Sequence, residues 1–257
     1  MKGGRLPDLI IGGAPRSGTT ALCHLLARHP EIYVAQPFIP EPKICLFERP
    51  GGRTHEEAYA ELFAAAPAGA KTVEKTSNYF ENEDAAERLA RVVPGTRFLF
   101  ILREPAARAW SNYLWSRRNG LETLCFEEAL AREESRSSPF TGERSYVRPF
   151  DYKRRGYYDI HAERYLSAFP RERILFVLFE RMITETEAVC AEIQAFLGVT
   201  VRPLGPLTGR INSATGCAPA PQPHPATMAA LRRHFRPHVE RFAALSGIDL
   251  SPWGYGG

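Results

Sequence analysis

Short apolar runs without polar alternation are the feature that most limits the fold of this chain. They are rich in Ile, Leu, Val and Phe, and stretches with helical spacing of apolar residues separate them. Runs of this kind are typical of strands buried on both faces of a parallel sheet. The predicted strands are 8–12, 31–34, 71–73, 97–102 and 173–179, and the predicted helices are 19–28, 56–65, 82–92, 106–117, 126–134, 157–168, 185–197 and 226–245. This alternation predicts a single α/β domain over residues 1–257, with three layers and a mostly parallel central sheet flanked by helices.

Composition and charge limit what such a domain binds. The chain has 257 residues, of which 44% are hydrophobic and 24% charged, so it is long enough to bury its own core. Its net charge of +4 suits a small anionic ligand better than a nucleic acid. We therefore expect a small-molecule or glycan partner and no nucleic acid.

The cysteines and the apolar runs bear on the compartment. Five scattered cysteines show no spacing typical of metal ligands, which favours a reducing compartment and no metal site. No apolar run approaches the roughly 18 residues of a membrane span, and no signal-peptide pattern opens the chain. The sequence therefore predicts a soluble, cytoplasmic protein without a membrane partner, and it leaves the oligomeric state open.

A glycine-rich turn follows the first predicted strand. The segment Gly13-Ala14-Pro15-Arg16-Ser17-Gly18-Thr19-Thr20 runs from that strand into a predicted helix with an apolar stripe. Backbone N–H groups at a helix N-terminus are unpaired and carry partial positive charge, so they bind anions. The spacing matches the phosphate loop G-x-x-x-x-G-K-[ST] except that Thr19 replaces the lysine, which a nucleoside triphosphatase needs beside Mg²⁺. The turn carries a cation earlier, at Arg16, and it predicts a P-loop-like fold.

A second anion-binding pattern follows the strand 97–102. Arg103 stands at the carboxyl end of this strand, where open α/β sheets bind ligands. Ser111 follows two turns into the next predicted helix, whose start is fixed by a proline at position 105. A planar guanidinium with a nearby hydroxyl is suited to clamp a phosphate.

These two motifs resemble those of a known family. Pro15-Arg16-Ser17-Gly18-Thr19-Thr20 is similar to the 5′-phosphosulfate loop of sulfotransferases that use 3′-phosphoadenosine 5′-phosphosulfate (PAPS). Arg103-Glu104-Pro105 through Ser111-Asn112-Tyr113 is similar to their 3′-phosphate motif. Val73-Glu74-Lys75-Thr76-Ser77-Asn78-Tyr79-Phe80 resembles a segment of the heparan sulfate and bacterial carbohydrate branch. The resemblance implies transfer of a sulfuryl group from PAPS to a hydroxyl or amine of a sugar or secondary metabolite. It also implies a bacterial-type enzyme that leaves 3′,5′-ADP as product and uses no metal.

The resemblance also implies a set of site residues. Glu41, in a Glu-Pro turn after the second strand, is the predicted base, and its flanking prolines would hold it rigidly. Arg16 and Lys75 are the predicted catalytic cations, and Arg16 stabilises charge rather than donating a proton, because arginine does not lose one. The predicted PAPS-binding residues are Arg16, Ser17, Gly18, Thr19, Thr20, Arg103, Ser111, Gly209 and Arg210.

Two other functions stay open at this point. An ATP-dependent P-loop phosphotransferase would use the same loop architecture, although Thr19 in place of the lysine argues against it. A non-catalytic nucleotide-binding module would bind the same ligand without turnover. All these hypotheses require the turn around Ser17 to bind an anion, and the PAPS hypothesis adds that Arg103 binds the other end of the same nucleotide.

Overall fold

A computed structural model describes residues 5–48, 52–207 and 222–255. Contacts between Cα atoms divide the chain into two compact units. The first unit comprises Met1–Leu102 and Glu163–Ile211, and the second comprises Arg103–Ala162 and Asn212–Gly257. The single domain over residues 1–257 that the sequence predicts stays a prediction.

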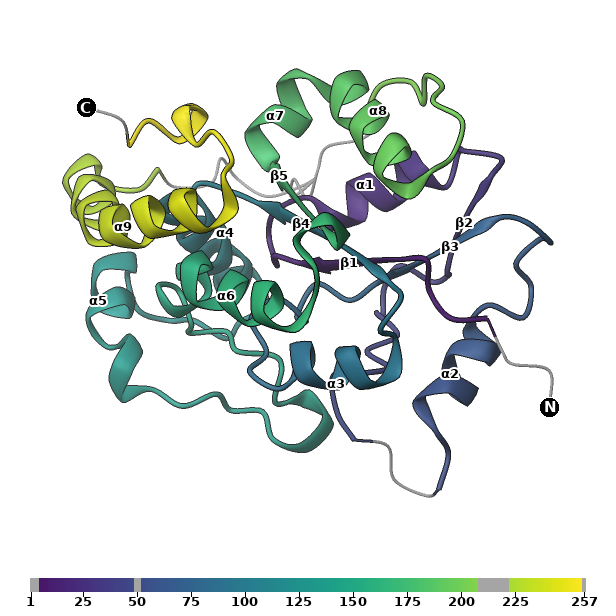
Figure 1. Cartoon of the computed structure of the whole chain (residues 1–257). Helices are drawn as coiled ribbons and strands as arrows, with labels where there is room; N and C mark the ends of the chain where they lie inside the picture. Colours follow the sequence, from purple (N-terminus) through teal and green to yellow (C-terminus); the bar gives the residue numbers. More distant parts are fainter. Residues whose placement is uncertain (1–4, 49–51, 208–221, 256–257) are drawn as a thin grey trace. The chain divides into compact units, whose positions relative to one another are not determined.

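The first unit contains a sheet of five parallel strands in the order β2-β3-β1-β4-β5 (Figure 1). The strands are β1 (Leu9–Gly13), β2 (Ile32–Val34), β3 (Lys71–Lys75), β4 (Arg97–Leu102) and β5 (Ile174–Leu178). In register, Leu9 of β1 lies opposite Val73 of β3 on one side and Arg97 of β4 on the other. All five predicted strands are confirmed, and β3 continues two residues past its predicted end, to Lys75.

One face of the sheet is covered by α1 (Thr19–Leu26), α7 (Phe179–Thr184) and α8 (Thr186–Leu197), which share a buried cluster with it. Alternate residues of β1, β4 and β5 point to this face, among them Ile11, Ile101 and Val177. The prediction of a strand that reaches Phe179 is wrong, because Phe179 begins α7. A short apolar run does not distinguish a buried strand from the start of a buried helix.

The opposite face of the sheet is aromatic. The rings of Phe98 and Phe100 on β4 contact Tyr165, at the end of α6 (Tyr158–Ala168). These two rings also contact each other, and Phe100 contacts Phe176 of β5. The ring centroids of Phe100 and Tyr165 are 4.6 Å apart in an edge-to-face arrangement. The remaining helices of this unit are α2 (His55–Leu62) and α3 (Ala85–Val92). The first unit thus has the predicted α/β architecture, with helices on both faces of a parallel sheet.

The second unit is helical. It contains α4 (Pro105–Arg118), α5 (Phe126–Ala131), α9 (Pro225–Ser246) and the beginning of α6, together with short 3-10 turns. The Glu104 carboxylate caps α4 by accepting hydrogen bonds from the N–H groups of Ala106, at 3.1 Å, and Ala107, at 2.7 Å. Tyr255 donates to the same carboxylate at 2.5 Å, so the end of the described chain helps to fix the start of α4.

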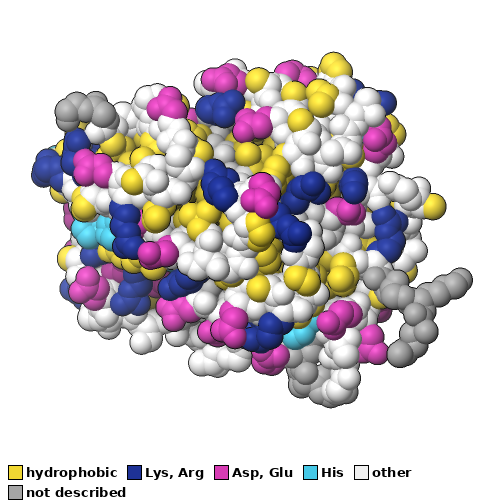
Figure 2. Space-filling view, in the orientation of Figure 1, with side chains coloured by type: hydrophobic (Ala, Val, Ile, Leu, Met, Phe, Trp, Pro, Cys, Tyr) yellow, Lys and Arg dark blue, Asp and Glu magenta, His cyan; other side chains and the backbone are white. Residues whose placement is uncertain are grey.

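Figure 2 shows basic and acidic side chains interspersed over the face that it presents. Within the described ranges, no helix combines the length and the apolar character that a membrane crossing requires.

Candidate active site

The turn between β1 and α1 is held by packing in the first unit. The Ala14 N–H donates to the Ile101 carbonyl oxygen across 2.7 Å, and Gly18 precedes α1 with φ of 87°. A Cβ atom on Gly18 would lie 2.7 Å from Met182 Cε and 2.9 Å from Phe179 Cε2. Only glycine allows both this left-handed backbone and so close an approach of α7.

The same turn presents groups that suit an anion. No side chain caps the start of α1, where the first N–H groups of a helix have no partner within the helix. The Ser17 side chain is fully buried, and its Oγ has no hydrogen-bond partner among the described residues. Arg16 holds φ of 72°, in the left-handed region that costs an L-residue about 1 to 2 kcal/mol. A buried hydroxyl without a partner beside an uncapped helix start fits a phosphate or sulfate oxygen, which would accept from both.

Lys75 connects this turn with the Glu41 segment. Its Nζ lies 2.9 Å from Glu41 Oε1, 3.0 Å from Thr20 Oγ1 and 3.1 Å from the Phe38 carbonyl oxygen. The Lys75 side chain is 4% exposed and that of Glu41 is 12% exposed, so water screens the pair weakly. Three residues that the sequence predicts for the site, Thr20, Glu41 and Lys75, are therefore in direct contact.

Ser77 is a member of this site that sequence reasoning missed. Its Oγ donates to Glu41 Oε1 at 2.6 Å, and its N–H donates to Glu41 Oε2 at 3.1 Å. With Lys75, the Glu41 carboxylate therefore accepts three hydrogen bonds, two at Oε1 and one at Oε2. A carboxylate has about four lone-pair sites, so the described residues leave one site open on Oε2. Ser77 lies two residues after Lys75 in the segment that resembles the heparan sulfate branch, but its place in that segment does not show that it contacts Glu41.

A second buried carboxylate lies beside Lys75 in sequence but on the other face of β3. Glu74 is fully buried, and it accepts hydrogen bonds from the hydroxyls of Tyr59, Thr76 and Tyr79 at 2.6, 2.8 and 2.9 Å. Burial raises the pKa of Glu74 to about 7, although the three hydroxyl donors act in the opposite direction. Its three partners come from α2 and from the turn after β3, so no local sequence pattern identifies it.

The other predicted site residues lie in the second unit or outside the described residues. Arg103 is half-buried, and its carbonyl oxygen accepts a hydrogen bond from Tyr158 at 2.8 Å. Ser111 is half-buried on α4. Gly209 and Arg210 lie outside the described residues. The roles of all four stay predictions.

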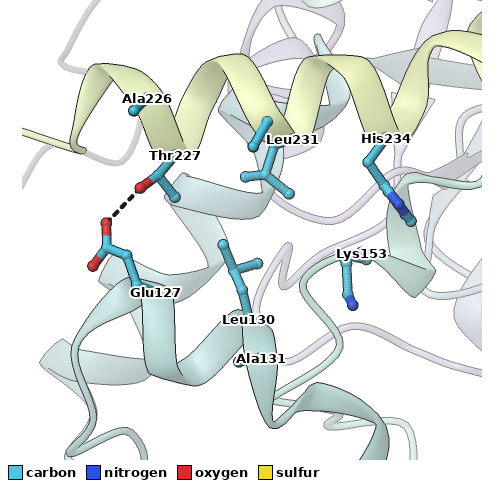
Figure 3. Close-up of a pocket in the computed structure, with 9 residues that line it drawn as sticks. Glu127, Leu130, Ala131, Lys153, Ala226, Thr227, Leu231 and His234 are labelled. Carbon is cyan, nitrogen blue, oxygen red and sulfur yellow. Dashed lines mark hydrogen bonds between the residues drawn. The ribbon is translucent and has the colours of Figure 1, made fainter.

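The second unit also contains an open pocket of about 500 Å³ (Figure 3). Leu130 and Leu231 form its apolar middle, and Lys153 and His234 lie together on one side of it. On another side, Thr227 donates to Glu127 at 2.8 Å. None of the predicted site residues that lie within the described ranges lines it. Within the described ranges, no three His, Cys, Asp or Glu side chains gather in a way that could hold a metal ion.

The chain is similar to known proteins in both sequence and fold. Residues 49–203 match the model of the sulfotransferase family. Mouse bifunctional heparan sulfate N-deacetylase/N-sulfotransferase 3 is 31% identical over 207 residues, which cover 76% of this chain and 23% of that protein. This chain therefore spans about a quarter of the length of that relative.

Two further similarities extend over nearly the whole chain. Human heparan sulfate glucosamine 3-O-sulfotransferase 6 is 28% identical over 278 residues, which cover 97% of this chain and 74% of that protein. The crystal structure of a sulfotransferase from Alicyclobacillus acidocaldarius superposes with a TM-score of 0.81 at 29% identity, over 97% of this chain and 99% of the other. Sequence and fold thus point to the same family.

Proposed function

This chain belongs to the sulfotransferase family, and we propose that it transfers a sulfuryl group from PAPS to a hydroxyl or amine of a sugar or secondary-metabolite acceptor. The observation that carries the proposal is the buried contact of Lys75 with both Glu41 and Thr20. This contact places a carboxylate and a cation next to the first turn of α1. A base, a cation and an anion-binding helix start are the groups that sulfuryl transfer requires.

The turn around Ser17 fits the 5′-phosphosulfate end of PAPS. The Ser17 hydroxyl and the N–H groups at the start of α1 would donate to its oxygens, and Arg16 would supply a positive charge. The transferred sulfuryl group carries a smaller negative charge than a γ-phosphoryl group, so side-chain cations can balance it. PAPS supplies the electrophilic sulfur and a leaving group, 3′,5′-ADP.

Glu41 acts as the base in this proposal. Its Oε2 has an open lone-pair site, and it accepts the proton of the acceptor hydroxyl or amine as the new bond to sulfur forms. The sulfur–oxygen bond to the leaving phosphate breaks in the same displacement, and the electron pair remains on that phosphate. Lys75 and Arg16 stabilise the negative charge that develops there, while Ser77 keeps the Glu41 carboxylate oriented.

The choice of donor separates this proposal from an ATP-dependent phosphotransferase. We expect 3′,5′-ADP at 100 times its dissociation constant to stabilise the protein by about 2.7 kcal/mol, which raises Tm by roughly 5 to 10 °C. ATP with Mg²⁺ at the same concentration should shift Tm much less, because Thr19 replaces the lysine that binds the β- and γ-phosphates. Differential scanning fluorimetry measures both shifts, and stabilisation by Mg-ATP alone would reverse the assignment.

Arg103 and Ser111 are proposed to bind the 3′-phosphate. We expect Arg103→Ala to weaken the affinity for 3′,5′-ADP by about 10- to 100-fold, because charge-assisted hydrogen bonds are lost, with little change in kcat. Isothermal titration calorimetry measures the affinity, and Arg118→Ala at the exposed end of α4 is the matched control. A lowered kcat with unchanged affinity would contradict the assignment.

The acceptor is proposed from the relatives. The names of the two curated relatives include an N-sulfotransferase and a 3-O-sulfotransferase of heparan sulfate, so both an amine and a hydroxyl of a sugar are candidate acceptors. Incubation of a panel of amino sugars and uronic-acid oligosaccharides with ³⁵S-labelled PAPS tests this choice directly. Label in none of the sugars but in phenolic or other secondary metabolites would replace the sugar by that class.

A further inference from the structure

The Glu41 turn is attached to the buried carboxylate of Glu74 through two hydroxyl groups. Thr76 Oγ1 donates to Glu74 Oε1 at 2.8 Å and accepts from the N–H of Lys43 at 3.0 Å. The Tyr79 hydroxyl donates to the same Oε1 at 2.9 Å and accepts from the N–H of Cys45 at 2.9 Å. The N–H groups of Lys43 and Cys45, which follow Glu41 closely, are therefore each connected to Glu74 Oε1 through one hydroxyl group.

The Thr76 and Tyr79 hydroxyls are buried and need an acceptor for their protons. Each hydroxyl has one proton and two lone pairs, so it can accept an N–H of the turn and donate its own proton at the same time. Glu74 Oε1 accepts the proton of both. If it is removed, two buried hydroxyls lose their partner, which costs free energy at each of them.

The turn itself needs such support. Lys43 has φ of 53°, a left-handed conformation that is unfavourable for a non-glycine residue. Conformations of this kind persist where the surrounding structure holds them from several sides. Pro42 alone separates Lys43 from Glu41, and its ring restricts φ. Fixing the Lys43 N–H therefore also restricts the position of the Glu41 backbone.

Other contacts hold the same segment from α3. Arg88 is 8% exposed, and its Nη1 donates to the carbonyl oxygens of Cys45 and Leu46 at 3.1 and 3.2 Å. The segment after Glu41 is thus bound through its N–H groups by Thr76 and Tyr79 and through its carbonyl groups by Arg88. Thr76 and Tyr79, which accept from the N–H groups, both donate to Glu74.

We propose that Glu74 is a positioning residue, which fixes the Glu41 turn through Thr76 and Tyr79 and so keeps the Glu41 carboxylate in place for proton transfer. The inference rests on the proposed function for its effect on turnover. Its structural part, the anchoring of Lys43 and Cys45, is independent of that function. Lys75 points to the opposite face of β3, so its contacts with Thr20 and Glu41 do not pass through Glu74.

The test compares two substitutions of one residue. Glu74→Leu keeps the approximate volume but removes Oε1, and we expect kcat to fall about 10- to 100-fold, the effect of a displacement of about 1 Å at a reacting group. The KM for PAPS and the affinity for 3′,5′-ADP should stay within about threefold, because the α1 turn keeps its contacts. Glu74→Gln retains an oxygen that can occupy the Oε1 position, so it should restore most of the lost turnover.

A second readout does not use activity. In Glu74→Leu, amide hydrogen exchange at Lys43 and Cys45 should become at least about 10-fold faster than in the unsubstituted protein, because local opening costs less free energy. Thr72→Val is the matched control, since Thr72 is buried on the same face of β3 but bonds to Leu6 and Asp8 instead. It should leave exchange at both amides and kcat unchanged.

The outcomes separate this inference from the proposed function. Normal kcat and normal exchange at Lys43 and Cys45 in folded Glu74→Leu would overturn the positioning role. Faster exchange in a protein that shows no sulfuryl transfer with any acceptor would support the anchor and contradict the proposed function instead. If Glu74→Leu does not fold, Thr76→Val and Tyr79→Phe each remove one connection, and each should speed exchange mainly at its own amide, Lys43 or Cys45 respectively. Failure of both to do so would also overturn the inference.

Discussion

We expect Glu41→Gln to lower kcat by about 10²- to 10⁴-fold, the usual contribution of a positioned general base, while 3′,5′-ADP still binds. Glutamine has nearly the same shape as glutamate, and its oxygen can still accept from Ser77. Its amide group has no useful affinity for a proton, so the acceptor must react without a base. Initial rates with ³⁵S-labelled PAPS measure kcat, and calorimetry measures the binding of 3′,5′-ADP.

Glu56→Gln is the control for this experiment, because Glu56 is an exposed glutamate on α2. It should change kcat by less than about twofold, as is usual for surface substitutions. Near-normal turnover in Glu41→Gln would remove Glu41 from its role as base. Binding of 3′,5′-ADP by the unsubstituted protein with no sulfuryl transfer to any acceptor would favour the non-catalytic nucleotide-binding module.

Lys75→Met should lower kcat/KM by about 10²- to 10³-fold, the effect of removing one group that stabilises developing charge in a closed site. The substitution removes the contacts of Nζ with Glu41, Thr20 and the Phe38 carbonyl group together. It also leaves the Glu41 carboxylate without its cation at 12% exposure, which should lower Tm as well.

Lys71→Met on the same strand is the matched control. Lys71 pairs with Asp8 at 3.0 Å, but its side chain is 35% exposed, and exposed ion pairs contribute about 0 to 1 kcal/mol. Its kcat/KM should stay within about twofold of the unsubstituted protein. A Lys75→Met enzyme with normal kcat/KM and a lowered Tm would show that Lys75 is structural only.

Local patterns predicted all five strands of the sheet, but the exact bounds of only one of them. The buried strand 97–102 was predicted with its bounds, because an unbroken apolar run is a strong signal. β3 was predicted two residues short, since Glu74 and Lys75 are charged and interrupt that signal. The structure shows why they belong to the strand: each charge is buried against specific partners that come from distant segments.

Only part of the candidate site was predicted, because some of its contacts join distant segments of the chain. Glu41 and Lys75 were predicted from a family resemblance, and the structure brings them to 2.9 Å, although their catalytic roles stay predictions. Ser77 and Glu74 were missed because their importance comes from contacts across the fold, with the Glu41 turn and with Tyr59 of α2. No spacing within the chain encodes such contacts.

The burial of Glu74 has a thermodynamic consequence for the whole first unit. Its pKa is raised to about 7 in the folded state, above the ordinary value of 4.5, so the native chain holds this proton more tightly than the denatured chain does. Linkage then requires that its contribution to folding free energy decline as the solution is made less acidic between these two values, and level off above them. Raising the pH from about 4.5 to about 7 therefore lowers the stability of the first unit through Glu74, and Glu74→Gln, which has no titratable proton at this position, should remove this pH dependence.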